Sequence, residues 1–191
     1  FEAHIATDGE ELNVGKLTIK VLHTPGHTME STTYLLLDEN GKPHCIFSGD
    51  TLFIGDVGRP DLAQKMGSLT QEDLAGYLYE SLHTKIMTLP DDVIVYPAHG
   101  AGSACGKNMS KETFDTLGHQ KEVNYALKAA SKEQFIKEVP DGLLPPPAYF
   151  PQNVAMNKGV IQSVDTVKEK GLRALNPDQF ELVAETEGAL V

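Results

Sequence analysis

Short apolar runs alternate with turn signals along the first hundred residues of the chain. Residues 17–22, 32–37 and 44–48 are rich in β-branched and apolar side chains, a pattern that is typical of buried strands. The segment between the last two runs, residues 38–42, carries Asn-Gly at its centre and predicts a hairpin turn. Residues 93–96 predict a fourth strand.

Two segments carry helical patterns. Residues 72–87 repeat leucine or isoleucine every four positions, and Thr70 with Asp73 predicts an N-terminal cap. Leu89-Pro90 then ends the helix. Ser131 and Gln134 form a capping box that predicts a second, shorter helix ending near residues 139–140. The apolar positions of the longer helix are Leu74, Leu78, Leu82 and Ile86.

The last part of the chain has a weaker pattern. Residues 164–173 predict a linker helix, and Asn176-Pro177-Asp178 is typical of a helix start. Residues 188–191 look like the opening of a buried strand. Because three prolines at 145–147 begin an extended stretch, we place a domain end at about residue 160 and a second segment at 161–191.

Composition excludes several classes of protein. The net charge of −11 argues against nucleic-acid binding, which needs a basic surface. No apolar run approaches the ~20 residues of a membrane span, and residues 1–4 show no signal pattern, so we expect a cytoplasmic protein without membrane contact. Cys45 and Cys105 lie 60 residues apart with no Cys-x-x-Cys spacing, so no disulfide framework is expected.

Three polar residues follow predicted strands, each framed by glycine or proline. His27 ends His-Thr-Pro-Gly-His, Asp50 ends Phe-Ser-Gly-Asp, and His99 ends Tyr-Pro-Ala-His. Ligands held on such rigid frames at a sheet rim are typical of metal sites, and imidazole with carboxylate suits zinc or non-haem iron. Taken singly, each histidine is more simply a surface or hydrogen-bonded residue. Together the three predict a metal centre.

The order of these motifs resembles the second half of the metallo-β-lactamase superfamily, and most of all its glyoxalase II and persulfide dioxygenase branches. The resemblance also includes Gly58-Arg59-Pro60-Asp61 and runs from about residue 5 to about residue 165. It implies an α/β fold, the second half of an αββα sandwich, with His27, Asp50 and His99 as metal ligands and Asp50 as the catalytic residue. The opening His-x-His-x-Asp-His motif of that family is absent. We therefore expect the chain to be the later part of a longer protein, inactive by itself.

Substrate contacts are expected on two loops. The resemblance implies that Arg59 binds a carboxylate of a thiol substrate, which an arginine can do bidentately. The alternative is a structural pair of Arg59 with Asp61 or Asp56. The glycine-rich loop 100–108 offers backbone N–H groups and a lysine that would cradle an anionic or thiol group, so we expect Gly102, Cys105 and Lys107 to bind substrate.

Three functions fit these residues. The first is a persulfide dioxygenase with Fe(II), which oxidises a low-molecular-weight thiol persulfide to sulfite. The second is a glyoxalase II-like thioester hydrolase with two zinc ions sharing Asp50. The third is an inactive fragment or interaction module, which leaves His27 and Asp50 unexplained.

The C-terminal segment bears on the choice between these functions. Residues 176–191 resemble the start of a rhodanese domain, although an ordinary terminal helix and strand would have the same pattern. A rhodanese-like segment favours sulfur chemistry and hence the dioxygenase. We also expect a homo-oligomer.

Overall fold

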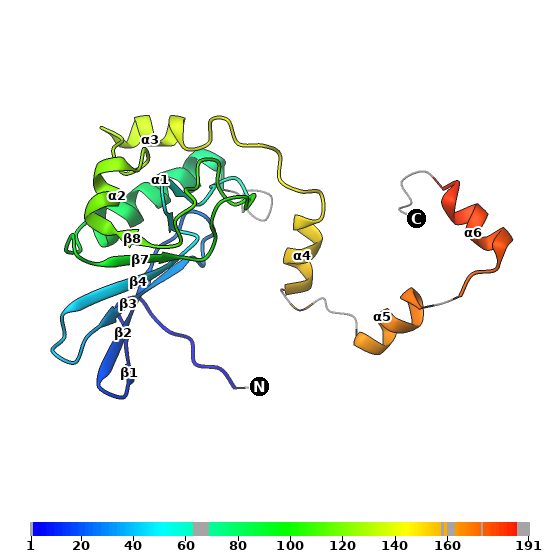
Figure 1. Ribbon diagram of the computed structural model, residues 1–191, viewed down its shortest axis with the longest axis horizontal. Coiled ribbons are helices and arrows are strands. Elements are labelled where there is room, and N and C mark those ends of the chain that lie inside the picture. The colour runs from blue at the N-terminus through cyan, green and yellow to red at the C-terminus, as the bar shows by residue number, and fades with distance from the viewer. Residues whose placement is uncertain (1, 63–68, 158, 160–162, 173, 187–191) are drawn as a thin grey trace. The chain divides into compact units, whose positions relative to one another are not determined.

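The computed structural model describes residues 2–62, 69–157, 159, 163–172 and 174–186 and divides into two units, Phe1–Pro146 and Pro147–Val191 (Figure 1). The candidate site residues all lie in the first unit. Within the described residues, none of the helices has both the length and the hydropathy needed to cross a bilayer.

A six-stranded mixed sheet forms the centre of the first unit. Its spatial order is β1 (Glu11–Val14), β2 (Leu17–His23), β3 (Thr32–Leu37), β4 (Pro43–Gly49), β7 (Ile94–Pro97) and β8 (Asp115–Thr116). A two-stranded sheet pairs β5 (Leu52–Phe53) with β6 (Asp56–Val57). The four predicted strands are present as β2, β3, β4 and β7. The other four were not predicted, because β1 is exposed throughout and the rest have two residues each.

Strand direction brings the candidate ligands to one edge of the sheet. β2 is antiparallel to β3 and β3 is antiparallel to β4, so β2 and β4 run the same way, and β7 is parallel to β4. The C-terminal ends of these three strands therefore lie at the same edge. His27, Asp50 and His99 each follow one of those ends.

The sheet has one buried and one partly exposed face, as the two-residue period of a strand requires. Paired positions on β3, β4 and β7 form one row against the core, with exposed fractions of 0–4%. The neighbouring positions form an aromatic row on the other face, with exposed fractions of 37–46%. The buried row is Leu35, Ile46 and Val95, and the aromatic row is Tyr34, Phe47 and Tyr96.

Helices pack on the buried face. α1 (Gln71–Ser81) continues into a π-helical turn, η2 (Leu82–Ile86), and α2 (Leu117–Val123) and α3 (Lys132–Glu138) lie on the same side of the sheet (Figure 1). The predicted cap of Thr70 with Asp73 is confirmed. At the second helix the Ser131 hydroxyl accepts from the Gln134 N–H, but the Gln134 side chain accepts from the N–H of Ala130 and not of Ser131, so the predicted capping box is only half formed. The predicted apolar positions Leu74, Leu78, Leu82 and Ile86 are all fully buried.

The π turn has a physical reason in the sequence. In a helix of 3.6 residues per turn, a repeat of four drifts steadily around the axis. An i→i+5 turn winds less per residue. It therefore offsets the drift and keeps Leu82 and Ile86 on the side of the helix that faces the core.

The described residues of the second unit form three short helices, α4 (Phe150–Asn157), α5 (Val164–Gly171) and α6 (Pro177–Ala184). The predicted helix starts are confirmed at α5 and α6, where Asn176 forms a capping box with Gln179 and Pro177 occupies the first turn. The strand predicted at residues 188–191 lies outside the described residues. The rhodanese-like character of this segment and the domain boundary near residue 160 stay predictions.

Candidate metal centre

His27 lies on a loop that rests directly on helix α1. The loop leaves β2 through Pro25 and Gly26, and Ser81 of α1 donates a hydrogen bond from its hydroxyl to the Pro25 carbonyl at 2.8 Å. Gly26 has a φ of +146°, and a Cβ at this position would overlap Leu78. The glycine of the motif therefore permits contact between the loop and the helix, which fixes the position of His27.

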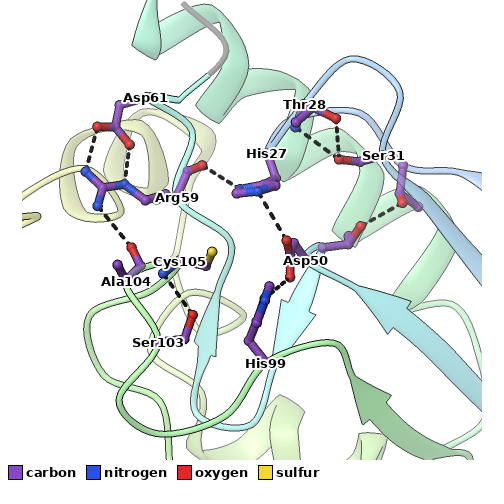
Figure 2. A network of polar contacts seen from close by, with 12 residues as sticks. His27, Thr28, Ser31, Asp50, Arg59, Asp61, His99, Ser103, Ala104 and Cys105 are labelled. Carbon is purple, nitrogen blue, oxygen red and sulfur yellow. Dashed lines mark hydrogen bonds and ion pairs between the residues drawn. The ribbon is translucent and has the colours of Figure 1, made fainter. Parts of the chain in front are cut away.

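The two ring nitrogens of His27 have different partners. Nδ1 lies 2.8 Å from the Arg59 carbonyl oxygen, and Nε2 lies 3.3 Å from Asp50 Oδ2 (Figure 2). A carbonyl can only accept, so Nδ1 carries the proton and, in the neutral ring, Nε2 presents a lone pair toward the carboxylate. At this distance a cation must lie between the two atoms, either the Nε2 proton of a charged His27 ring, which would donate to the carboxylate, or a metal ion bound by both. The pair thus fits a metal ion, held as metal-binding histidines are usually held.

Asp50 connects the two histidines. Its Oδ2 faces His27, and His99 Nδ1 lies 2.6 Å from its Oδ1. Burial opposes ionisation of this carboxyl group, but the contacts with His27 and His99 outweigh it and hold the pKa of Asp50 below its ordinary value. An ionised carboxylate between two imidazoles is the arrangement that metal ligation requires. The three predicted ligands therefore converge.

The backbone at Gly58 packs closely against the backbone of Asp50 and the ring of His27. A Cβ at Gly58 would overlap the Asp50 carbonyl oxygen and would lie 3.0 Å from His27 Nδ1. Only glycine allows the segment before Arg59 to pass between the two ligand loops. The Gly-Arg-Pro-Asp motif therefore acts here through its glycine and through the Arg59 carbonyl.

Buried hydroxyl groups lie under the ligand loops. The Thr24 hydroxyl lies 2.7 Å from that of Thr51 and 3.2 Å from that of Thr33, and all three residues are fully buried. The Thr33 hydroxyl donates to the Ser48 carbonyl at 3.4 Å. Because each hydroxyl has one proton, Thr24 must donate to Thr33 and Thr51 must donate to Thr24. This one-way chain ties the His27 loop to the strands that carry Asp50.

Cys105 joins the candidate ligands. One ligand atom from each of His27, Asp50 and Cys105 lies within 4.8 Å of the other two. Among the described residues this is the group of side chains that could hold a metal ion, and it does not include His99. Figure 2 shows the three side chains pointing toward one another. Burial raises the pKa of the half-buried Cys105 thiol, and the charge of Asp50 adds to this effect.

Arg59 is paired within the protein. Its Nε and Nη2 donate to the two carboxylate oxygens of Asp61 at 2.6 and 2.7 Å, and the side chain is only 3% exposed. Its guanidinium also donates to the carbonyls of Ala104 and Leu144. The structural Arg59–Asp61 pair considered as an alternative is present, whereas the Arg59–Asp56 pair is not among the contacts of the described residues. Binding of a substrate carboxylate by Arg59 stays a prediction, for which one Nη1 proton remains.

The glycine-rich loop does cradle an anion, and that anion is Asp56. The backbone N–H groups of Lys107 and Asn108 each donate to Asp56 Oδ2 at 2.6 Å. The Lys107 ammonium donates to the carbonyls of Glu138 and Asp141 and lies 5.0 Å from the centre of the Tyr125 ring. Substrate binding by Lys107 would require these contacts to open. Gly102 occupies an exposed turn with a φ of +94°.

Asp56 is the residue that sequence reasoning missed as an organiser of the site. It is 1% exposed, and its Oδ1 accepts from the Tyr125 hydroxyl at 2.9 Å and from the Val57 N–H at 2.8 Å. Two buried amides, Asn124 and Gln120, also bind the backbone of this segment. The available signal was a charged residue within the apolar run Leu52–Val57, a position that requires burial with partners.

The chain is similar to three characterised proteins or structures. Persulfide dioxygenase ETHE1, mitochondrial, of Homo sapiens is 32% identical over 140 residues, 73% of this chain and 47% of the human protein. A crystal structure of a metallo-beta-lactamase from Staphylococcus aureus has a TM-score of 0.72 at 37% identity and covers 81% of this chain and 44% of its own. The crystal structure of ETHE1 from Myxococcus xanthus has a TM-score of 0.62 at 32% identity, with 80% and 58% coverage. No protein-family model matches the chain.

Fold, site and similarity agree on one class. The chain belongs to the metallo-β-lactamase superfamily, and the relatives it matches include persulfide dioxygenases and a probable metallo-hydrolase. Within it, the chain belongs to the persulfide dioxygenase branch. It spans about half the length of the curated relatives it matches. The predicted family and the predicted α/β fold are confirmed.

Proposed function

We propose that the protein of which this chain is part oxidises a low-molecular-weight thiol persulfide to sulfite and thiol. The observation that carries the proposal is the His27 Nε2–Asp50 Oδ2 pair, two facing electron-pair donors 3.3 Å apart. Its similarity to persulfide dioxygenases supports the reaction class. In the balanced reaction, one persulfide, one O₂ and one water give one thiol, one sulfite and two protons.

Fe(II) is the proposed metal. His27 and Asp50 would be two members of a two-histidine, one-carboxylate set, with the other histidine supplied by the longer protein. When bound, iron in such a set leaves positions open for O₂ and a sulfur ligand. The residues of this chain orient that set, because the Arg59 carbonyl fixes the ring of His27 and His99 holds the second oxygen of Asp50.

Cys105 and the loop that carries it form the proposed substrate side. The loop passes beside both ligands, so a persulfide that binds along it would have its outer sulfur next to the metal, at a position other than that of the Cys105 sulfur. A cytoplasmic location and a homo-oligomeric state are part of the same proposal. Residues 1–191 alone are expected to be inactive.

The test uses the full-length protein purified without added metal. We expect one iron per chain and O₂ uptake with glutathione persulfide or coenzyme A persulfide. Asp50→Asn should abolish both. Asp115→Asn is the matched control, because Asp115 also lies against a histidine, His119, at 2.5 Å and has a similar exposed fraction, 23% against 21%. This control should keep its iron and its O₂ uptake.

A second candidate function rests on His99. Because each oxygen of Asp50 faces a different histidine, the carboxylate is placed as a bridge between two ions would be. This favours a thioester hydrolase with two zinc ions. Two zincs per chain with efficient hydrolysis of a glutathione thioester, and no O₂ uptake with either persulfide, would establish this function and refute the dioxygenase.

A further inference from the structure

The sulfur of Cys105 lies where a third metal ligand would lie. Metal bonds of zinc or iron to nitrogen, oxygen and sulfur are about 2.0–2.3 Å long, so two ligands of one ion lie at most ~4–4.6 Å apart. The mutual separations of the His27, Asp50 and Cys105 ligand atoms stay within 4.8 Å. Small side-chain movements would bring all three onto one ion.

Arg59 fixes the backbone on one side of the cysteine. Its N–H donates to the Cys105 carbonyl at 3.0 Å, and its Nη1 donates to the Ala104 carbonyl at 3.0 Å. The Cys105 N–H in turn donates to the Ser103 hydroxyl at 3.2 Å. The same arginine holds His27 through its carbonyl. One buried residue thus sets the position of the histidine and the cysteine relative to each other.

Asp56 fixes the backbone on the other side. It binds the N–H groups of Lys107 and Asn108, the second and third residues after the cysteine. Between them, a Cβ at Gly106 would lie 2.7 Å from Asp56 Oδ2, so the sequence Cys-Gly allows the carboxylate to approach the loop. A buried side chain of a charged residue type on each side of a single cysteine, Arg59 on one and Asp56 on the other, indicates that the position of its sulfur matters.

We propose that Cys105 Sγ is a protein ligand of the same metal ion that His27 and Asp50 bind. The inference deepens the proposed function and rests on it only in placing the metal on His27 and Asp50. A thiolate added to imidazole and carboxylate selects softer divalent ions such as zinc, cobalt and iron over magnesium and calcium. Binding of the ion releases the thiol proton to solvent, because the ligand is the thiolate.

The experiment is a cobalt(II) titration of the full-length protein, in which the remaining histidine ligand is present, followed by absorption spectroscopy. Thiolate bound to cobalt gives a sulfur-to-metal charge-transfer band in the near ultraviolet, which imidazole and carboxylate do not give. We expect the band in the unaltered protein and its loss in Cys105→Ala. Loss of a residue that only supports a metal ligand costs roughly tenfold to hundredfold in metal affinity. Because Cys105 would itself be a ligand, Cys105→Ala should lower the cobalt affinity by more than that.

Cys45→Ala is the matched control, since Cys45 is the other cysteine of the sequence and is buried in β4. It should keep the full band. Proton release on cobalt binding, measured in weakly buffered solution, should fall by one proton in Cys105→Ala and should not change in Cys45→Ala.

Three results would overturn the proposal: no cobalt retained, cobalt retained without the band, or a band that survives Cys105→Ala. None of these decides the proposed function, which O₂ uptake by the full-length protein measures separately. Conversely, a full-length protein without O₂ uptake but with a Cys105-dependent band would refute the reaction and leave the ligand assignment standing.

Discussion

The direction of the hydrogen bonds in the buried threonine chain leads to a testable prediction: a second substitution should restore part of the stability that a first one removes. In Thr24→Val the hydroxyl of Thr51 loses its acceptor, and it lies where no solvent reaches. A buried donor without a partner costs about 1–3 kcal/mol. We therefore expect this variant to lose about 2 kcal/mol of unfolding free energy.

Thr51→Val removes only the first donor of the chain. Thr24 still donates to Thr33, and Thr33 still donates to the Ser48 carbonyl, so no proton is left without an acceptor. The expected loss is that of one hydrogen bond, about 0.5–1.5 kcal/mol. In the double variant Thr24→Val/Thr51→Val the stranded hydroxyl is gone. It should be more stable than Thr24→Val alone, by about 1 kcal/mol.

Urea unfolding followed by circular dichroism measures these differences by linear extrapolation. Thr18→Val is the control, because the hydroxyl of Thr18 makes an exposed hydrogen bond to Asn13 on the same sheet. It should change the unfolding free energy by less than about 0.5 kcal/mol. A double variant that loses at least the sum of the two single losses would refute the direction assigned to the chain.

Three further predictions address the frame of the site. Lys85→Met should destabilise the protein near neutral pH. The hydrogen bond from Lys85 holds the pKa of Asp8 below its ordinary value of 3.8, so this contact stabilises the protein above pH 3.8 and ceases to do so as pH falls through the lowered pKa. In thermal melts, the stability difference between the variant and the unaltered protein should therefore narrow below pH 3.8. Gly58→Ala should cost about 1–3 kcal/mol in urea unfolding and weaken cobalt binding, because its Cβ would overlap the Asp50 carbonyl. An unchanged cobalt affinity would contradict that packing argument. Leu78→Ala should cost about 2–5 kcal/mol, since Leu78 is fully buried against the sheet, and a loss below 1 kcal/mol would mean that α1 is not packed as described.

Local sequence predicted the elements whose causes are local. The capping pair at Thr70 and the N-cap hydrogen bond of Ser131 formed as expected, because their partners lie three residues away in the chain. The apolar repeat along α1 and η2 identified buried core residues for the same reason, since its members lie four residues apart in the chain. β1 escaped prediction because all its residues are exposed, so its pattern carries no signal of burial. The π turn was missed because a repeat of four residues is compatible with an ordinary helix.

The site divides in the same way. His27, Asp50 and His99 could be predicted, since each follows a strand and is framed by glycine or proline. Their convergence follows from strand direction, which the sequence suggests only through resemblance. The pair of Arg59 with Asp61 could be considered from the sequence, because the two residues lie two positions apart. The contacts of Arg59 with Ala104 and of Asp56 with Lys107 could not, because these partners lie 45 and 51 residues away in the chain.

The sequence by itself therefore determined which residues are candidates for binding a metal and which segments carry them. The tertiary structure decided which of those residues meet, that Arg59 is paired within the protein, and that Cys105 lies against His27 and Asp50. The reason is physical: strand and helix patterns record interactions with neighbours in the chain. The ligand set and the contacts of Arg59 and Asp56 with the loop that carries Cys105 are long-range, and they exist only once the sheet has brought its strand ends together.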